Sequence, residues 1–467
     1  MSAERDACYR NVMRSYPNEI VATSSVTPPS TTIVRAKRSG QKQCLKRRSP
    51  PPDRGRFFVS NCGVTFALAE VGSSVDTDTG ELTVQPYFAP VCRLDNGALA
   101  AIEVQLRGPE GGPLASADAL KRAARAMDAK RELDTLAWRV ARLEQSVRLP
   151  MLVSMDVGSL AAIDSATEEQ LRRDIVVVTE AALVDSPART LASIDKARRD
   201  GKVVAVDDVG RRPQSMTLLP LIEPDVIILA ETMVSTRPDV STARTAHAVS
   251  AQVERTGAVV VASGVDTALH RSRALGLGAT YGVGELYPAA QSTEELPADA
   301  AEVMPPFPTW STPATALESP YAIAAAGKIA TRSTKRLLVA MSTSLEMQAA
   351  SAGPETLILG TFQRAEHFTP TTRARWVSMA EQISYAGVYG VGMGYVQEGG
   401  IVHAPIDPAD SLVEEWNVVV LGPHFCGVLA AIDLHRGEAD ADREFDYVMS
   451  YDRATVVRCA RAILARF

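Results

Sequence analysis

The sequence predicts an α/β protein with two domains: a barrel-like domain of alternating strands and helices, and a smaller α/β domain after it. The chain has 467 residues, which is too long for one ordinary domain. From residue 82 to residue 290, short aliphatic runs alternate with longer helical patterns, which is the rhythm of parallel β/α units. Residues 291–316 are rich in Pro, Ser and Thr and favour neither helix nor strand, so they predict a linker before a second domain at 317–467.

Six β/α steps are visible in the first domain, whereas a closed (β/α)8 barrel of the TIM type needs eight. The predicted strands are 98–102, 151–155, 175–178, 203–206, 226–229 and 259–262. The predicted helices are 117–127, 133–143, 188–200 and 240–256. The pattern by itself does not decide whether the sheet closes.

The second domain has the size of a compact sensor module. Its apolar runs lie at 356–359, 388–394, 416–421 and 427–432, and helical patterns are predicted at 321–347 and 442–467.

Composition favours a globular, cytoplasmic protein. Hydrophobic residues make up 46% of the chain and charged residues 22%, and no run of about 18 apolar residues could span a bilayer. The first residues are polar and do not have the order of a secretory signal. The six cysteines form no CxxC pair, which argues against a structural zinc site and a disulfide framework.

Charge is distributed unevenly along the chain. Residues 1–56 carry a net charge of +8, so the remaining residues carry −14. The acidic body disfavours general binding to nucleic acid. The basic segment contains Pro50-Pro51-Pro52 and little to bury, so disorder is the favoured prediction for residues 1–56. Contact with nucleic acid or anionic lipid through this tail is the alternative.

Three motifs follow predicted strands of the first domain. They are Ile102-Glu103-Val104-Gln105-Leu106-Arg107, Val206-Asp207-Asp208-Val209-Gly210 and Ala262-Ser263-Gly264-Val265-Asp266-Thr267. In this order and spacing the segment 57–290 resembles the EAL family, barrel enzymes that hydrolyse cyclic di-GMP. The resemblance implies an EAL-type (β/α)8 barrel, a homodimer formed through it and an active site at the carboxyl ends of its strands.

Some positions of the family's site keep suitable side chains. The resemblance places Glu103 on a metal-binding Glu and Arg107 on an Arg near the ligand phosphate. The family's metal-binding Asn falls on Asp156, and its paired aspartates fall on Asp207 and Asp208. The candidate metal ligands are therefore Glu103, Asp156 and Asp207, for Mg²⁺ or Mn²⁺, and the candidate ligand-binding residues are Arg107, Asp207 and Asp208.

Other positions have lost the chemistry that hydrolysis needs. The catalytic Lys corresponds to Ile228, which cannot carry a proton. Two metal-binding Glu residues correspond to Val177 and Ser263, which leaves few anions to hold two divalent ions. A further Asp and Gln of the family fall on Ala230 and Val283. These losses predict a degenerate EAL domain that is not an enzyme and has no catalytic residues.

Simpler interpretations remain for the residues that survive. Glu103 and Arg107 are four apart and could form a surface ion pair. Asp207-Asp208-Val209-Gly210 also suits a turn after a strand. Asp156 and Asp266 could cap helices.

The second domain resembles the DICT family of sensory domains. The resemblance rests on the segment from Thr361-Phe362-Gln363-Arg364 to Gly387-Val388-Tyr389-Gly390 and implies no ligand. The run Gly390-Val391-Gly392-Met393-Gly394 could hold a phosphate, but a bulged or tightly packed strand is favoured. His367, His403 and His424 are too far apart to indicate a metal site, so each is expected to be a hydrogen-bonded structural residue.

These interpretations combine into one hypothesis about function. The chain is expected to be a bacterial signalling protein whose inactive EAL-like domain is a cyclic di-GMP receptor or a scaffold for a protein partner. A residual cyclic di-GMP phosphodiesterase is the alternative, motivated by Glu103, Asp207 and Asp208.

Overall fold

The computed structural model describes residues 57–60, 63–66, 82–144, 147–160, 174–179, 186–296, 304 and 318–467. The predicted basic tail at 1–56 and most of the predicted linker at 291–316 lie outside these residues. Within the described part of the chain, no helix is both long and apolar enough to cross a membrane.

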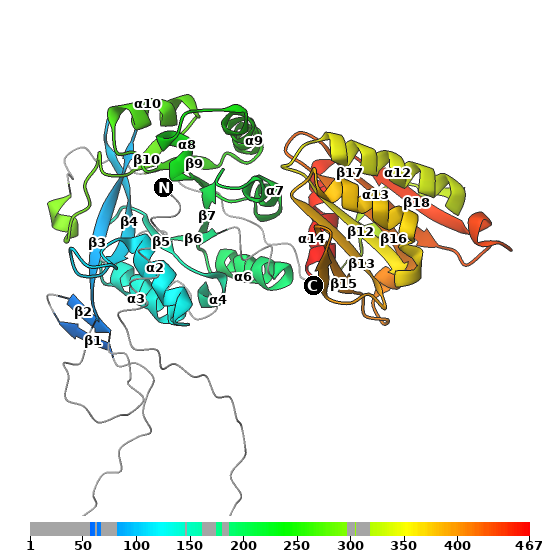
Figure 1. Ribbon diagram of the computed structural model, residues 1–467, viewed down its shortest axis with the longest axis horizontal. Coiled ribbons are helices and arrows are strands. Elements are labelled where there is room, and N and C mark those ends of the chain that lie inside the picture. Colours follow the sequence, from blue (N-terminus) through cyan, green and yellow to red (C-terminus); the bar gives the residue numbers. More distant parts are fainter. Residues whose placement is uncertain are drawn as a thin grey trace, which may run out of the picture. The chain divides into compact units, whose positions relative to one another are not determined.

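The first domain is a closed barrel of eight strands with helices on its outer surface (Figure 1). The barrel order is β3-β10-β9-β8-β7-β6-β5-β4, and β3 also pairs with β4. The strands are β3 (Leu82–Arg93), β4 (Leu99–Arg107), β5 (Met151–Ser154), β6 (Ile175–Thr179), β7 (Val203–Val209), β8 (Val226–Leu229), β9 (Val259–Ser263) and β10 (Tyr281–Val283). The α/β barrel that the sequence predicted is therefore confirmed. The structure also shows that the sheet closes, which the sequence pattern had left open.

One barrel strand runs against the other seven. Neighbouring strands from β4 to β10 are parallel, but β10 pairs with β3 in antiparallel register at Gly282 and Cys92. The tight connection from β3 to β4 reverses the chain at Gly97, where φ is +78°. The periodic pattern missed β3 because Pro86 and Pro90 argue against an interior strand, and missed β10 because it has three residues.

The helices of the barrel domain agree with the predicted ranges and add short ones. They are α2 (Ala117–Ala126), α3 (Lys130–Leu143), α4 (Val157–Leu160), α6 (Pro187–Arg199), α7 (Pro213–Ile222), α8 (Glu231–Ser235), α9 (Val240–Thr256) and α10 (Ala268–Gly276), with the 3-10 helix η1 (Thr293–Glu295) after the barrel. Before the barrel, β1 (Phe57–Ser60) and β2 (Gly63–Phe66) form a hairpin, and β2 pairs with the start of β3.

The barrel interior is a packed aliphatic core. Small and branched side chains from alternate positions of the strands fill it, as the two-residue period of a strand requires. The cluster includes Ala101, Leu152, Val177, Ala205, Val226, Ile228, Val261 and Val283. Polar groups at the carboxyl ends of the strands therefore lie directly above a hydrophobic core.

The second domain is an eight-stranded mixed sheet with helices on both faces. The order is β11-β18-β17-β16-β12-β13-β15-β14, in which β12, β13 and β15 are parallel neighbours and the other pairs are antiparallel. The strands are β11 (Thr331–Thr334), β12 (Leu357–Arg364), β13 (Tyr385–Val391), β14 (Val396–Glu398), β15 (Ile401–Pro405), β16 (Glu415–Leu421), β17 (Cys426–Asp433) and β18 (Glu444–Ser450). The helices are α11 (Pro320–Ala325), α12 (Lys335–Ser351), α13 (Pro370–Ala380) and α14 (Arg453–Leu464), and the 3-10 turns are η3 (Ala365–His367), η4 (Ser411–Glu414) and η5 (Asp440–Asp442).

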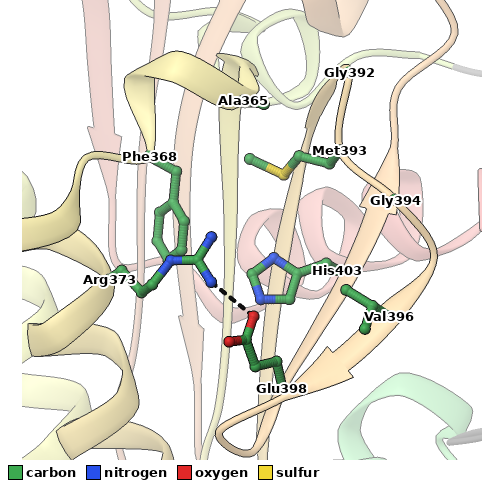
Figure 2. A pocket seen from close by; sticks show the side chains of 9 residues that line it. All are labelled: Ala365, Phe368, Arg373, Gly392, Met393, Gly394, Val396, Glu398 and His403. Atoms are coloured by element: carbon green, nitrogen blue, oxygen red, sulfur yellow. Dashed lines mark hydrogen bonds and ion pairs between the residues drawn. The ribbon is translucent and has the colours of Figure 1, made fainter.

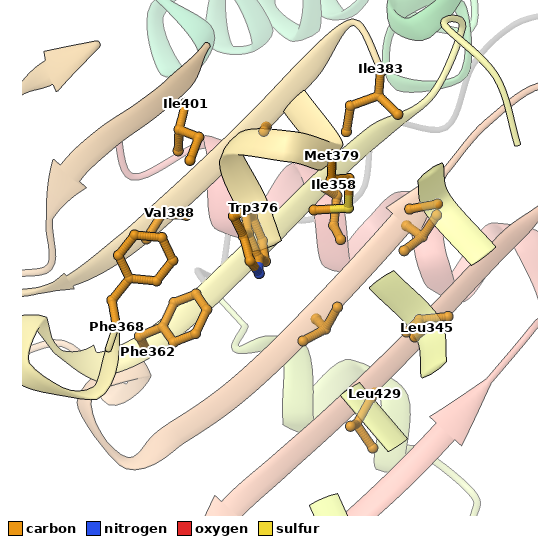
Figure 3. Close-up of a cluster of buried hydrophobic side chains, with 14 of the residues drawn as sticks. Leu345, Ile358, Phe362, Phe368, Trp376, Met379, Ile383, Val388, Ile401 and Leu429 are labelled. Carbon is orange, nitrogen blue, oxygen red and sulfur yellow. The ribbon is translucent and has the colours of Figure 1, made fainter. Parts of the chain in front are cut away.

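Helices α12 and α13 lie on one face of this sheet and α14 on the other (Figure 1). Between the sheet and α12 and α13, Trp376 is fully buried and packs edge-on against Phe362 and Phe368, with ring centroids 5.6 and 6.2 Å away (Figure 3). A side chain at Gly360 would come within 2.8 Å of the Trp376 ring, so the glycine makes room for the indole.

Two predicted helices of the second domain were wrong in part. The range 321–347 is broken at Gly327, where φ is +70°, and contains β11 between α11 and α12. The range 442–467 holds β18 before α14, which begins after the N-cap Asp452. Both misassigned segments pair with each other, since Thr331 lies opposite Tyr447, and this long-range pairing overrides local helical spacing.

Candidate functional site

Two carboxylates stand at the carboxyl ends of barrel strands. Glu103 lies on β4 and Asp207 on β7, each two residues beyond an alanine of the barrel core, Ala101 and Ala205. Because strand side chains alternate, both carboxylates are placed on the interior face at the mouth of the barrel. Glu103 accepts a hydrogen bond from Gln105 Nε2 at 2.8 Å. Arg107 ends β4 and is half-buried.

Burial perturbs the acidity of Asp207 most. It raises the pKa of this carboxyl to about 6, and the neighbouring carboxylates of Asp208 and Glu103 raise it further, while the ammonium of Lys121 opposes them. The backbone N–H of Asp208 donates to Asp207 Oδ1 at 2.7 Å. The structure thus brings Glu103, Asp207 and Asp208 into one electrostatic group together with a lysine from α2.

Asp208 lies on a β-bulge and does not follow a regular turn. The register between β7 and β8 shifts between Val206 and Val209, and Asp208 has a φ of +62°. Its carboxylate pairs with Arg211 at 3.0 Å. At Gly210, φ is +95° and a Cβ would come within 2.6 Å of Met233 Sδ, so this loop needs a glycine.

Asp156 is neutralised by basic side chains. Arg125 Nη2 lies 2.8 Å from Asp156 Oδ1, and Lys130 Nζ lies 3.5 Å from the same oxygen. Burial would raise the pKa of Asp156, but the hydrogen bonds and charges of Arg125 and Lys130 lower it. Lys130 also pairs with the buried Asp134, which accepts from Asp156 N at 2.9 Å and from Ser159 Oγ at 2.7 Å.

The alternative in which Asp266 caps a helix does not hold, because the neighbouring residue is the cap. Thr267 caps α10 by accepting from His270 N, while Asp266 Oδ1 accepts from Glu285 N at 2.8 Å and holds the loop after β10. For Asp156, the carboxylate that was considered as a helix cap is taken up by Arg125 and Lys130.

Four of the five positions at which the resemblance places family groups that this chain lacks hold apolar residues, and the fifth is Ser263. Val177, Ile228 and Val283 belong to the barrel core, with exposed fractions of 4%, 7% and 9%. Ala230 is buried, and Ser263 ends β9. Within the described residues no group of three or more His, Cys, Asp or Glu side chains is placed to hold a metal ion.

Sequence reasoning missed the basic side chains of the mouth. Lys121, Arg125 and Lys130 come from α2 and α3, the two helices after β4. In the sequence, these residues have the pattern of exposed helix positions. Only the fold shows that they face two carboxylates, Asp207 on β7 and Asp156 after β5.

A closed eight-stranded barrel with one reversed strand and polar groups at the carboxyl ends of its strands defines an α/β barrel domain of the (β/α)8 type. Residues 78–290 match the family model of the EAL domain. Residues 324–434 match DICT, the "Sensory domain in DIguanylate Cyclases and Two-component system". The chain therefore carries an EAL domain followed by a DICT domain.

Solved EAL structures are also similar to this chain. The EAL domain of FimX from Xanthomonas citri, in complex with c-diGMP, is 19% identical over 44% of this chain and 88% of that one, with a TM-score of 0.36. The EAL domain of FimX from Pseudomonas aeruginosa, bound to c-di-GMP, is 17% identical over 45% and 91%, with a TM-score of 0.36. LapD from Vibrio cholerae, solved as S helix-GGDEF-EAL, is 18% identical with a TM-score of 0.37. The match covers 44% of this chain and 53% of the LapD chain, so this chain spans about half of that structure. No curated protein sequence matches the chain.

Proposed function

We propose that this chain is a cyclic di-GMP signalling protein of the cytoplasm whose EAL domain binds the dinucleotide without hydrolysing it. The observation that carries the proposal is Ile228, which is 7% exposed in the barrel core at the position that the family resemblance gives to the catalytic lysine. An aliphatic side chain can neither take a proton from water nor orient it.

The electrostatics of the mouth support binding without catalysis. In a two-metal hydrolase, divalent ions offset the carboxylates and the phosphate charge. Here Lys121 interacts with Asp207, and Arg125 and Lys130 hold Asp156. These cations reduce the repulsion that a dianionic ligand would meet, and we assign its contacts to Arg107, Asp207 and Asp208.

In this proposal the DICT domain supplies a signal, and the EAL domain relays it to a protein partner, with dimerisation through the barrel as in the implied family arrangement. A residual phosphodiesterase is the second candidate. It is favoured by one observation, the grouping of Glu103, Asp207 and Asp208, because these carboxylates are retained together.

The test is a calorimetric titration of cyclic di-GMP into the full chain, with a parallel turnover assay in Mg²⁺ and in Mn²⁺. We expect saturable binding that is weakened at least tenfold in Lys121→Ala and in Arg107→Ala, and no turnover. The matched control is Arg122→Ala, which removes an exposed cation one residue from Lys121 on α2. Turnover of cyclic di-GMP would establish the phosphodiesterase instead, and absence of binding would leave the barrel as a scaffold.

A further inference from the structure

The DICT domain contains a small cavity at the edge of its sheet (Figure 2). It lies between η3, the first turn of α13, and the loop and hairpin that follow β13. Its volume is about 200 Å³, roughly seven times the share of one water molecule in the liquid. This is below the ~300–1,000 Å³ of sites for drug-sized ligands, so the cavity suits a small metabolite. It is lined by Ala365, Phe368, Arg373, Gly392, Met393, Gly394, Val396, Glu398 and His403.

A glycine turn brings two opposite charges together at this cavity. Strands β14 and β15 are joined by Gly399 and Gly400, with φ of +57° and +77°, the signs that a two-residue type I′ hairpin turn requires. A side chain at Gly399 would come within 3.0 Å of Val377, so the glycine lets the hairpin approach α13. Glu398 at the end of β14 then accepts a hydrogen bond from Arg373 Nη1 of α13 at 2.7 Å.

The aromatic wall holds the guanidinium in place. The Arg373 Cζ atom lies over the Phe368 ring, 5.5 Å from its centroid, which is the geometry of a cation–π contact. Figure 2 shows Met393 and His403 beside this pair, facing the same space. The cavity therefore combines an apolar wall with one cation and one anion.

His403 brings a buried polar atom that has no partner in the described structure. The residue is 6% exposed, its ring contacts Phe368 edge-on at 5.7 Å, and its Nε2 makes no hydrogen bond. Burial lowers the pKa of His403 and Arg373 lowers it further, while Glu398 opposes both, so the imidazole is neutral at neutral pH. A buried unpaired nitrogen costs about 1–3 kcal/mol, and because less than 1 Å² of Nε2 is accessible, a ligand atom satisfies it once the side chains around it shift.

We propose that this cavity binds a free amino acid, with the ligand carboxylate on Arg373, its ammonium on Glu398, and its side chain against Phe368 beside His403. The charges of Arg373 and Glu398 cancel, so a ligand with one charge would leave the opposite protein charge without its partner. A zwitterion replaces the ion pair between Arg373 and Glu398 with two, one between its carboxylate and Arg373 and one between its ammonium and Glu398. The walls formed by Met393 and Val396 accept an apolar side chain, and His403 Nε2 selects one that carries a hydrogen-bonding group. This inference does not depend on the function proposed for the barrel.

The test uses the full chain and the twenty L-amino acids singly, first by thermal shift and then by calorimetry. We expect at least one amino acid whose side chain combines an apolar part with a hydrogen-bonding group to bind saturably. Its Kd should rise at least tenfold in Arg373→Gln and in His403→Phe. In Glu398→Gln the deaminated analogue, which keeps the carboxylate, should bind better than the amino acid itself. The matched control is Arg332→Gln, which breaks the exposed ion pair of Arg332 with Asp446 and should leave binding unchanged.

Two results would overturn the proposal. One is that none of the twenty amino acids binds at millimolar concentration. The other is that an amino acid binds equally well in Arg373→Gln, or that its amide binds as well as the free acid, because then the carboxylate would not be recognised here.

Discussion

Replacing Asp207 by Asn should change how the stability of the barrel depends on pH. Burial raises the pKa of Asp207 to about 6 from the ordinary 3.8. Below the ordinary value the side chain is protonated in both the folded and the unfolded chain and contributes nothing. As the pH rises from about 4 to about 7, the unfolded chain loses this proton first, so the free energy of unfolding falls.

The size of this effect follows from the shift. A change of about 2 pKa units at 1.36 kcal/mol per unit corresponds to at most about 3 kcal/mol. The carboxyl is only partly buried, and solvent screening reduces the figure. Asp207→Asn should therefore be more stable than the natural chain at about pH 7.5 by up to about 3 kcal/mol, and equally stable at about pH 4.

The assay is urea unfolding of both proteins across this pH range, followed as the difference between them, which cancels the other titrating groups. Asp208→Asn is the comparison variant, since it removes the same charge from the neighbouring residue, and Asn tolerates the left-handed backbone there. Because Asp208 raises the pKa of Asp207, this variant should keep the fall in stability with rising pH but make it smaller. A difference that does not vary with pH would refute the reasoning. Millimolar Mg²⁺ that stabilises the natural chain and not Asp207→Asn would show that a cation binds this carboxylate.

Four further substitutions, in three comparisons, test the packing. Ile228→Ala should cost about 2–5 kcal/mol in urea unfolding, because Ile228 fills the barrel core; a negligible loss would mean that it lines an open site. Gly264→Ala should cost more than Gly257→Ala, by about 1 kcal/mol or more, in the same assay. Both have positive φ, but a Cβ at Gly264 would lie 2.3 Å from Glu231 Cγ and one at Gly257 touches nothing; equal costs would contradict this. Trp376→Ala should destabilise the DICT domain by about 3–5 kcal/mol, because the indole is fully buried. Unfolding is followed by far-UV circular dichroism, which reports the backbone and does not require the indole. A loss of stability no larger than that caused by a substitution at an exposed position would disprove the central place of this ring.

Local patterns predicted most of the barrel. The strand at Val226–Leu229 and the helix at Val240–Thr256 have the predicted bounds, because a buried aliphatic run and a capping box at Asp239 are signals contained in the residues themselves. In the second domain the signals failed where a segment pairs with a distant one. Thr331–Thr334 and Glu444–Ser450 were assigned to helices. The first is a strand only because it pairs with the second, more than 100 residues away, and the second also pairs with β17.

The cavity of the DICT domain shows the same division. The glycines at 390–394 were expected to form a bulged or packed strand, but Gly392 and Gly394 belong to the loop that lines the cavity. His403 was expected to be hydrogen-bonded, and its Nε2 is not. Neither outcome was accessible from the sequence, because both depend on α13 packing against the hairpin of β14 and β15.

By itself, the sequence determined that aliphatic residues stand at Val177 and Ile228, and an aliphatic side chain can act neither as a base nor as a metal ligand in any fold. It also determined the alternation of strands and helices between residues 98 and 262 of the barrel, because the spacing of apolar residues is a local property. Only the tertiary structure decided that the barrel closes through a reversed strand, and that Lys121 faces Asp207. It alone placed Arg373, Glu398 and His403 around one cavity. These arrangements join side chains from separate elements, whose distances depend on how the whole chain packs and not on any local run of residues.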